Sequence, residues 1–147
     1  MGRVVSVNIS EKKGTVKKPV EEISLKIRHG ILGDAHAGDW HRQISLLAEE
    51  SVDKLRPLLP DLPPGAFAEN VNTEGVDLKA LPVGTRLRLG ETVVEVTQIG
   101  KECHNGCVSK KAVGKCVMPT EGIFAVVITE GTVRKGDEIE ILKETVL

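Results

Sequence analysis

The chain has 147 residues, and its 20 Lys and Arg residues nearly balance its 21 Asp and Glu residues, giving a formal net charge of −1. This length is typical of one domain, so we expect a single domain over residues 1–147. A balanced charge gives no general attraction to nucleic acid or to a membrane surface. Because the chain has one Trp, two Phe and no Tyr, it also offers few rings for stacking with single-stranded nucleic acid. We therefore expect neither nucleic acid nor a membrane as a partner.

The start of the chain predicts no targeting segment. Its first residues, MGRVVSVNISEKK, contain no long apolar run of the kind that a secretory signal needs. No stretch approaches the roughly 20 apolar residues of a membrane-spanning helix. We expect a cytoplasmic protein whose thiols stay reduced, which disfavours disulfides.

Short alternating stretches of apolar and polar residues predict β-strands along most of the chain. The run IFAVVIT at 123–129 is nearly continuous and predicts a central strand, and EGT at 130–132 predicts a hairpin turn. The other predicted strands cover residues 4–9, 23–27, 43–47, 85–89, 92–99 and 137–142. Alternation places Val5, Val7 and Ile9 on one face of the first strand and Val94, Val96 and Gln98 on one face of another, and it predicts that Leu87 and Leu89 point inward.

Helical segments are few. One helix, from Ala48 to about Leu59, is predicted by apolar residues at helical spacing. Single helical turns are predicted at 79–84 and 107–113. Many short strands with glycine at the corners predict a mainly β fold, an antiparallel β-barrel with one or two short helices.

Three segments are richer in polar and reactive residues than simple connections. The histidine loop, residues 28–43, holds three His, two Asp, two Arg and three Gly, and long loops in compact domains are often functional. The AEN loop, residues 63–75, places Glu69 and Asn70 beside apolar neighbours. The cysteine segment, residues 99–124, contains all three cysteines. We expect the three segments to meet at one mouth of the barrel.

The three cysteines, Cys103, Cys107 and Cys116, allow three interpretations that the residues alone leave open. A disulfide is disfavoured in a reducing compartment. Zinc needs four ligands, here three cysteines and a histidine, and the first two cysteines have a zinc-like spacing without a second close pair. A single reactive thiolate is favoured by the neighbouring lysines and opposed by Glu102. In that case the other two cysteines are packing residues.

The three segments occur in an order that resembles the MOSC domain family, named for the C-terminal domain of molybdenum cofactor sulfurases. The similarity begins at VNISEKKGTVKKPV and continues through GILGDAHAG, RQISLL and GAFAENV. It then covers LPVGTRLRLG, the strand before Cys103, and GIFAVVITEGTVRKGDEI, so it extends over almost the entire chain. The fold of the family is a β-barrel, which agrees with the fold predicted above.

The resemblance implies a molybdenum cofactor of the molybdopterin type, or a sulfur-carrying role, centred on Cys103. As catalytic residue and metal ligand, Cys103 would supply a soft thiolate. Arg42 and Lys101 would bind the cofactor's phosphate, and Glu69 and Asn70 would bind the pterin ring. The expected cofactor-binding residues are Asp34, His36, Arg42, Glu69, Asn70 and Lys101.

By the same resemblance we expect a cofactor-binding or sulfur-carrier domain in molybdenum cofactor metabolism, acting with cofactor-biosynthesis proteins. The alternative is a self-contained molybdenum-dependent reductase of N-hydroxylated or N-oxide substrates. Such a reductase would need an external electron-transfer protein, because the chain has no flavin or iron–sulfur motif of its own. A zinc-structured binding module is the third alternative.

Overall fold

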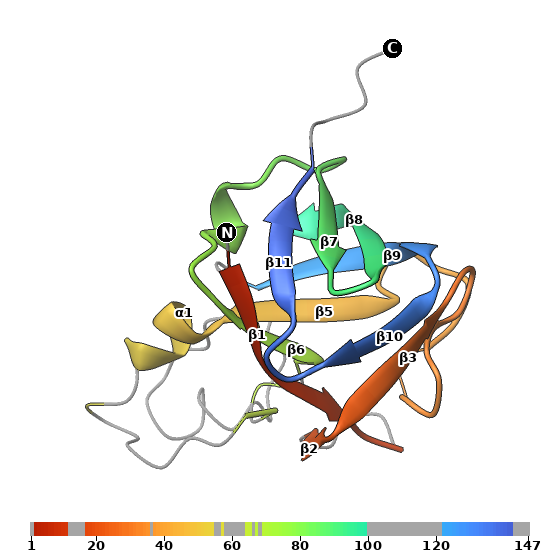
Figure 1. Cartoon of the computed structure of the whole chain (residues 1–147), viewed down its shortest axis with the longest axis horizontal. Coiled ribbons are helices and arrows are strands. Elements are labelled where there is room, and N and C mark those ends of the chain that lie inside the picture. The colour runs from red at the N-terminus through yellow and green to blue at the C-terminus, as the bar shows by residue number, and fades with distance from the viewer. Residues whose placement is uncertain are drawn as a thin grey trace, which may run out of the picture.

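The computed structural model of the chain describes residues 2–11, 17–35, 37–54, 57, 64–65, 67, 69–99 and 122–142. Its main body is a barrel of seven strands in the order β1-β11-β7-β8-β9-β5-β6, closed where β6 pairs with β1 (Figure 1). The barrel strands are β1 (Gly2–Ile9), β5 (Ile44–Ala48), β6 (Val71–Glu74), β7 (Arg86–Leu89), β8 (Thr92–Ile99), β9 (Ile123–Thr129) and β11 (Glu138–Ile141).

Four further strands lie outside the seven-stranded barrel. The short strand β2 (Lys18–Val20) pairs with β1. A separate three-stranded sheet has the order β10-β3-β4, formed by β10 (Gly131–Arg134), β3 (Glu22–Lys26) and β4 (Gly30–Ile31). The prediction of a mainly β barrel with short helices is thereby confirmed.

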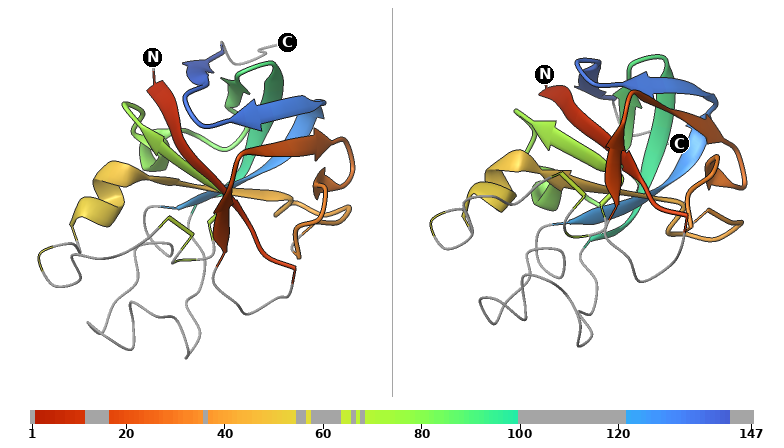
Figure 2. Two further views of the ribbon diagram at one scale, coloured as in Figure 1. Left: turned by 60° about the horizontal axis from the view of Figure 1, so that its bottom comes forward. Right: turned by 90° about the horizontal axis from the view of Figure 1, so that it is seen from below.

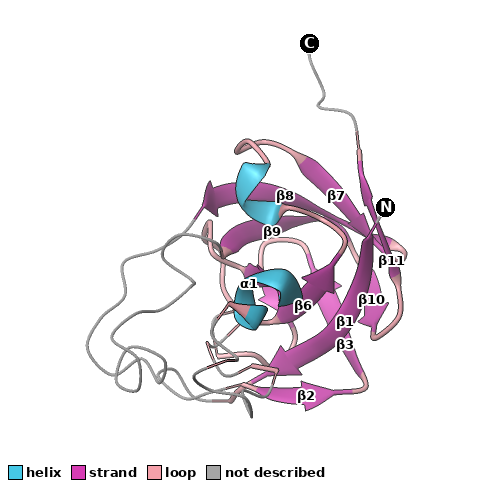
Figure 3. Ribbon diagram, turned by 90° about the vertical axis from the view of Figure 1, so that its left-hand side faces the viewer, coloured by secondary structure: helices cyan, strands magenta, loops and turns pink. Residues whose placement is uncertain are grey.

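One strand pair in the barrel is parallel. Leu46 of β5 lies beside Val71 of β6 with both strands running in the same direction, whereas every other strand pair of the described residues is antiparallel. Parallel neighbours need a long crossover connection. Residues 49–70 provide it, beginning with helix α1 (Glu49–Asp53), which packs against β5 and β6 (Figure 3).

The predicted inward faces of β7 and β8 are confirmed for their aliphatic residues. Leu87, Leu89, Val94 and Val96 are fully buried and belong to one continuous apolar core. The central position of β9 is also confirmed, since it pairs with β8 on one side and β5 on the other. Strict alternation in these strands turns every second side chain to the interior.

Two β-bulges change faces that simple alternation predicted. In β1, the register shifts between Val4 and Ser6, so Val4 enters the core in place of Val5. In β8, a second shift between Val96 and Gln98 takes Gln98 out of the buried face and leaves it partly exposed. A bulge inserts one extra residue, which re-aims the side chains that follow it.

The predicted hairpin at 130–132 is wrong. The chain does leave β9 at Thr129, but β10 pairs with β3, with Gly131 opposite Leu25, and makes no ladder with β9. Side-chain carboxylates help to hold this second sheet, because Glu130 accepts a hydrogen bond from the backbone N–H of Ile27 at 2.9 Å. The turn was predicted correctly as a change of direction, but the partner strand comes from elsewhere in the sequence.

The helical predictions are partly covered by the described residues. Helix α1 begins one residue after Ala48 and is described as far as Asp53. The turn predicted at 79–84 is a short 3-10 helix, η1, at Leu78–Ala80. The turn predicted at 107–113 lies outside the described residues. Within the described part of the chain, no helix is long and apolar enough to cross a membrane.

Candidate functional site

The mouth of the barrel is the end where β1 and β8 finish and where β6 and β9 begin (Figure 2). Strand register places these ends in one row. Val7 of β1 lies opposite Val71, Val71 lies beside Leu46, Leu46 lies opposite Ile123, and Ile123 lies opposite Ile99. The AEN loop therefore enters the barrel at the same end as the cysteine segment, with β5 between β6 and β9.

Asn70 joins three strands at this mouth. Its side-chain oxygen accepts hydrogen bonds from the backbone N–H and the hydroxyl of Ser45, at 3.0 and 3.1 Å, and its Nδ2 donates to the carbonyl of Asn8 at 3.2 Å. The side chain is buried. Because both ends of the amide are used by the protein, Asn70 fixes the separation of β1, β5 and the start of β6.

Glu69 organises the AEN loop from within. Its two carboxylate oxygens accept hydrogen bonds from the backbone N–H groups of Gly65 and Phe67, each at 3.0 Å, and from Asn72 Nδ2 at 2.7 Å. Burial raises the pKa of Glu69 above its ordinary value, while the three donors act in the opposite direction. The carboxylate is the anchor around which this loop is arranged.

The amide orientations around Glu69 follow from chemistry. Asn8 Nδ2 donates to the backbone carbonyl of Glu69, which can only accept, so the nitrogen of Asn8 is fixed. The same nitrogen donates to Asn72 Oδ1 at 2.8 Å, which turns Asn72 Nδ2 toward the Glu69 carboxylate. Every partner of that carboxylate is therefore a donor, as an ionised carboxylate requires.

Asp34 of the histidine loop forms a fully buried ion pair. Lys17 Nζ lies 2.7 Å from Asp34 Oδ1, and both side chains have no exposed surface. The backbone N–H of Ser10 donates to the same oxygen at 3.1 Å, and the hydroxyl oxygen of Ser10 accepts a hydrogen bond from Lys17 Nζ at 3.2 Å. The backbone N–H of Lys17 also donates to the carbonyl of Gly65. Lys17 thus connects the end of β1, the histidine loop and the AEN loop.

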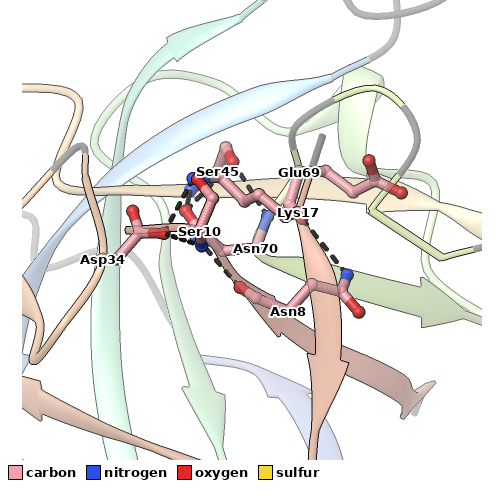
Figure 4. A network of polar contacts seen from close by, with 7 residues as sticks. All are labelled: Asn8, Ser10, Lys17, Asp34, Ser45, Glu69 and Asn70. Carbon is pink, nitrogen blue, oxygen red and sulfur yellow. Dashed lines mark hydrogen bonds and ion pairs between the residues drawn. The ribbon is translucent and has the colours of Figure 1, made fainter. Parts of the chain in front are cut away.

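Gly65 is required at this junction. Its φ of +86° lies in the left-handed region, and an added Cβ would collide with the backbone of Lys17. Figure 4 shows seven of the residues that meet here. We call these seven the mouth network: Asn8, Ser10, Lys17, Asp34, Ser45, Glu69 and Asn70.

Arg42 lies beside the end of β8 and the start of β9, the two strand ends that flank the cysteine segment. Its Nε donates to Gln98 Oε1 at 3.0 Å, near the end of β8, and its guanidinium carbon lies 5.1 Å from the centre of the Phe124 ring, near the start of β9. Its side chain is partly buried. Among the described residues no carboxylate pairs with Arg42, which makes it a cation held in place and available to an anion.

The predicted site residues divide into two groups. Asp34, Glu69 and Asn70 lie in the mouth network with their side chains bonded to the protein, whereas Arg42 presents unused donors. His36, Lys101 and Cys103 lie outside the described residues, as do Cys107 and Cys116. The assignment of these residues to cofactor binding stays a prediction.

The part of the chain that the structure describes contains no group of three or more His, Cys, Asp or Glu side chains suited to a metal ion.

Sequence reasoning missed several residues at the mouth. Lys17, Ser10, Asn8 and Ser45 carry much of the mouth network, and Gln98 holds Arg42. Their partners within the mouth network lie between 7 and 62 positions away in the sequence, and Arg42 lies 56 positions from Gln98. Only the polar residues inside otherwise apolar strands, such as Ser45 in ISLLA, gave a signal that they had a role.

A second depression lies at the opposite end of β6. It has a volume of about 360 Å³ and is lined by α1 and by the connection from Gly75 to Lys79. Its charged groups are occupied, since Glu50 accepts from the N–H of Gly75 and Lys79 pairs with Asp77. The mouth, where the predicted residues Asp34, Arg42, Glu69 and Asn70 lie, is therefore the candidate site.

Comparison with known families identifies the chain. The MOSC domain profile matches residues 33–140, which include the histidine loop from Gly33, the AEN loop and the whole cysteine segment. The chain belongs to the MOSC domain family. MOSC domains are associated with proteins of the molybdenum cofactor sulfurase type. No match was found among curated proteins.

Solved structures share the fold of this MOSC domain. YuaD from Bacillus subtilis aligns with a TM-score of 0.79 and 21% sequence identity, covering 96% of each chain. YiiM from Geobacillus stearothermophilus aligns with a TM-score of 0.73 and 20% identity, covering 97% of this chain and 76% of the other. YiiM from Escherichia coli gives 0.69 and 22%, with 97% and 70% coverage. At these identities the likeness establishes the barrel architecture.

Proposed function

We propose that this MOSC domain binds a molybdenum cofactor of the molybdopterin type at its barrel mouth, through Arg42 and Cys103. The observation that carries the proposal is the position of Arg42. Its guanidinium is held between Gln98 and Phe124, at the two strand ends that carry the cysteine segment, without a carboxylate partner among the described residues. A partly buried and unneutralised cation favours an anionic ligand.

The donor set fits such a cofactor. The phosphate of a pterin cofactor needs cations and N–H donors, and neither Nη group of Arg42 is bonded to another of the described residues. Cys103 follows Ile99 by four residues, and four residues of chain span at most about 14 Å. A thiolate is a soft ligand suited to molybdenum and able to carry sulfur as a persulfide. When bound, the cofactor would supply a redox-active metal centre or an acceptor for sulfur.

The remaining predicted residues take supporting roles in this proposal. Asp34, Glu69 and Asn70 hold the loops that surround the ligand, because their hydrogen bonds are made to the protein. Lys101 adds a second cation two residues before Cys103, and His36 follows Asp34 in the histidine loop. Arg42 binds and orients the anionic end of the ligand, while Cys103 provides the reacting sulfur.

Two cellular roles are consistent with this site. As a carrier in cofactor metabolism, the domain would exchange cofactor or sulfur with biosynthesis proteins. As a reductase of N-hydroxylated or N-oxide substrates, it would receive electrons from an external protein. The carrier role is our first proposal because residues 1–147 contain no flavin or iron–sulfur motif that could supply electrons.

Protein purified from a host that makes the cofactor tests the binding proposal. We expect molybdenum and pterin in stoichiometric amounts with the wild type, and a loss of both with Arg42→Gln. Arg88→Gln is the matched control, because Arg88 pairs with Glu140 on the barrel surface away from the mouth. Wild-type protein that contains neither molybdenum nor pterin would contradict the proposal.

The cysteines provide a second test. Cys103→Ala should abolish retention of molybdenum or loading of persulfide, whereas Cys107→Ala and Cys116→Ala should keep most of it. A structural zinc site would instead make all three substitutions equally damaging to metal content and to folding. Equal loss in the three variants, with zinc in the wild type, would therefore replace the proposal by a zinc module.

A further inference from the structure

One amide oxygen at the mouth holds two side chains of the histidine loop. Gln98 Oε1 lies 3.0 Å from Arg42 Nε and 2.9 Å from His41 Nε2. An arginine Nε can only donate, so the atom of Gln98 that faces it is the oxygen. That oxygen can only accept, and His41 Nε2 must therefore carry a hydrogen. The proton position on His41 follows from its neighbours.

Arg42 is restrained on two sides. Its guanidinium carbon lies over the Phe124 ring at 5.1 Å from the ring centre, and its Nε is bonded to Gln98. A planar guanidinium held against a ring and bonded at Nε keeps a defined direction for its two Nη groups. No described residue accepts a hydrogen bond from these Nη groups. Their N–H donors therefore point in a fixed direction and have no acceptor within the described structure.

We propose that Gln98 is a positioning residue, which holds Arg42 and His41 so that the Nη groups of Arg42 bind an anion offering two oxygens side by side. Phosphate and carboxylate groups have this geometry, whereas a halide ion does not. The proposal rests on the proposed function for the location of the site, but it concerns how the anion is recognised. It assigns to Gln98 a role that the family match does not state.

The distinction between positioning and simple tethering is testable at the neighbouring residue. Thr97 also joins β8 to the histidine loop, because its hydroxyl donates to the backbone carbonyl of His41. In the described structure its hydroxyl bonds to His41 and not to the guanidinium of Arg42. If Gln98 merely ties the loop to β8, its replacement should affect anion binding no more than replacement of Thr97. If Gln98 orients Arg42, its replacement should weaken anion binding more.

The experiment is a titration of the full chain with inorganic phosphate. Binding is measured by calorimetry and by the fluorescence of Trp40. Trp40 is the single tryptophan and its ring packs edge-on against His41, with centroids 5.8 Å apart, so it reports on this site. We expect Gln98→Leu to weaken phosphate binding about tenfold, equivalent to about 1.4 kcal/mol, and Thr97→Val to change it less than about twofold. Arg42→Lys should weaken it as strongly as Gln98→Leu, because charge without the fork is insufficient.

Sodium chloride at equal ionic strength is the control for charge alone, and the melting temperature of each variant is measured in parallel. Saturable phosphate binding that chloride does not reproduce, together with the expected order of variants, supports the proposal. Equal affinity in Gln98→Leu and wild type would overturn it, as would equal losses in Thr97→Val and Gln98→Leu or the absence of phosphate binding by the wild type.

The outcome is separable from that of the cofactor experiment. Tight phosphate binding with the expected variant order, in a wild type that purifies without molybdenum, supports the role of Gln98 and removes the proposed cofactor. Normal molybdenum retention by Gln98→Leu leaves the proposed cofactor in place and overturns the role of Gln98.

Discussion

The barrel interior and the mouth network are stabilised by different kinds of interaction. The interior is lined by aliphatic residues such as Leu87, Leu89 and Val94, whose burial is non-directional and depends mainly on volume. The mouth network consists of buried polar groups, each with a partner at a defined distance. Replacement by an apolar residue of similar size should therefore be tolerated in the interior and should destabilise the protein at the mouth.

The largest effect is expected from breaking the buried ion pair. Lys17→Met leaves the Asp34 carboxylate buried without its cation, which should lower the free energy of unfolding by about 3–5 kcal/mol in urea titrations. The double variant Lys17→Met/Asp34→Asn should recover part of this loss, because an amide oxygen still accepts from the N–H of Ser10. Lys79→Met, which breaks an exposed pair with Asp77, should cost less than about 0.5 kcal/mol. A similar loss in both single variants would remove the distinction between the regions.

Asn70 tests the same contrast with a neutral group. Asn70→Leu keeps the approximate size but leaves the N–H of Ser45 and the carbonyl of Asn8 without that partner, and should cost about 2–3 kcal/mol. Leu87→Met in the interior should cost less than about 1.5 kcal/mol. Chemical unfolding of both variants measures the difference. Equal costs would mean that the mouth tolerates apolar packing as the interior does.

Glu69 predicts a pH dependence that comes from the mouth. Burial raises the pKa of Glu69 in the folded protein above its ordinary value, so the folded state binds more protons than the unfolded state. The free energy of unfolding should then fall as pH rises through the folded pKa of Glu69. Glu69→Gln cannot titrate and should lack this part of the slope. Parallel slopes for wild type and variant in urea titrations across the acidic range would show that Glu69 does not contribute.

The smallest effect is expected from an unsatisfied hydroxyl. The Oγ1 of Thr73 is buried and has no hydrogen-bond partner among the described residues, so Thr73→Val should be neutral or should stabilise the protein by about 1 kcal/mol. Thr92 is the matched control, because its hydroxyl donates to the carbonyl of Leu89 at 2.8 Å and its replacement by Val should cost about 1 kcal/mol. Thermal unfolding of the two variants should therefore give shifts of opposite sign, or no shift for Thr73→Val.

The sequence by itself determined the fold class, most strands and the inward faces of β7 and β8. These follow from local rules, because Leu87 and Leu89 are two residues apart and the period of a strand is two. It also directed attention to Glu69, Asn70 and Arg42 through the motifs in which they occur. The family resemblance was established by the profile match over residues 33–140.

Only the tertiary structure decided which polar groups meet. Lys17 and Asp34 are 17 residues apart, Asn8 and Asn70 are 62 apart, and Arg42 and Gln98 are 56 apart. Apolar burial is visible in the sequence because any buried neighbour stabilises an aliphatic side chain. A hydrogen bond requires one partner at one distance and angle. That partner is selected by the bulge in β1, the parallel pairing of β5 with β6 and the closure of the barrel, which no local pattern specifies.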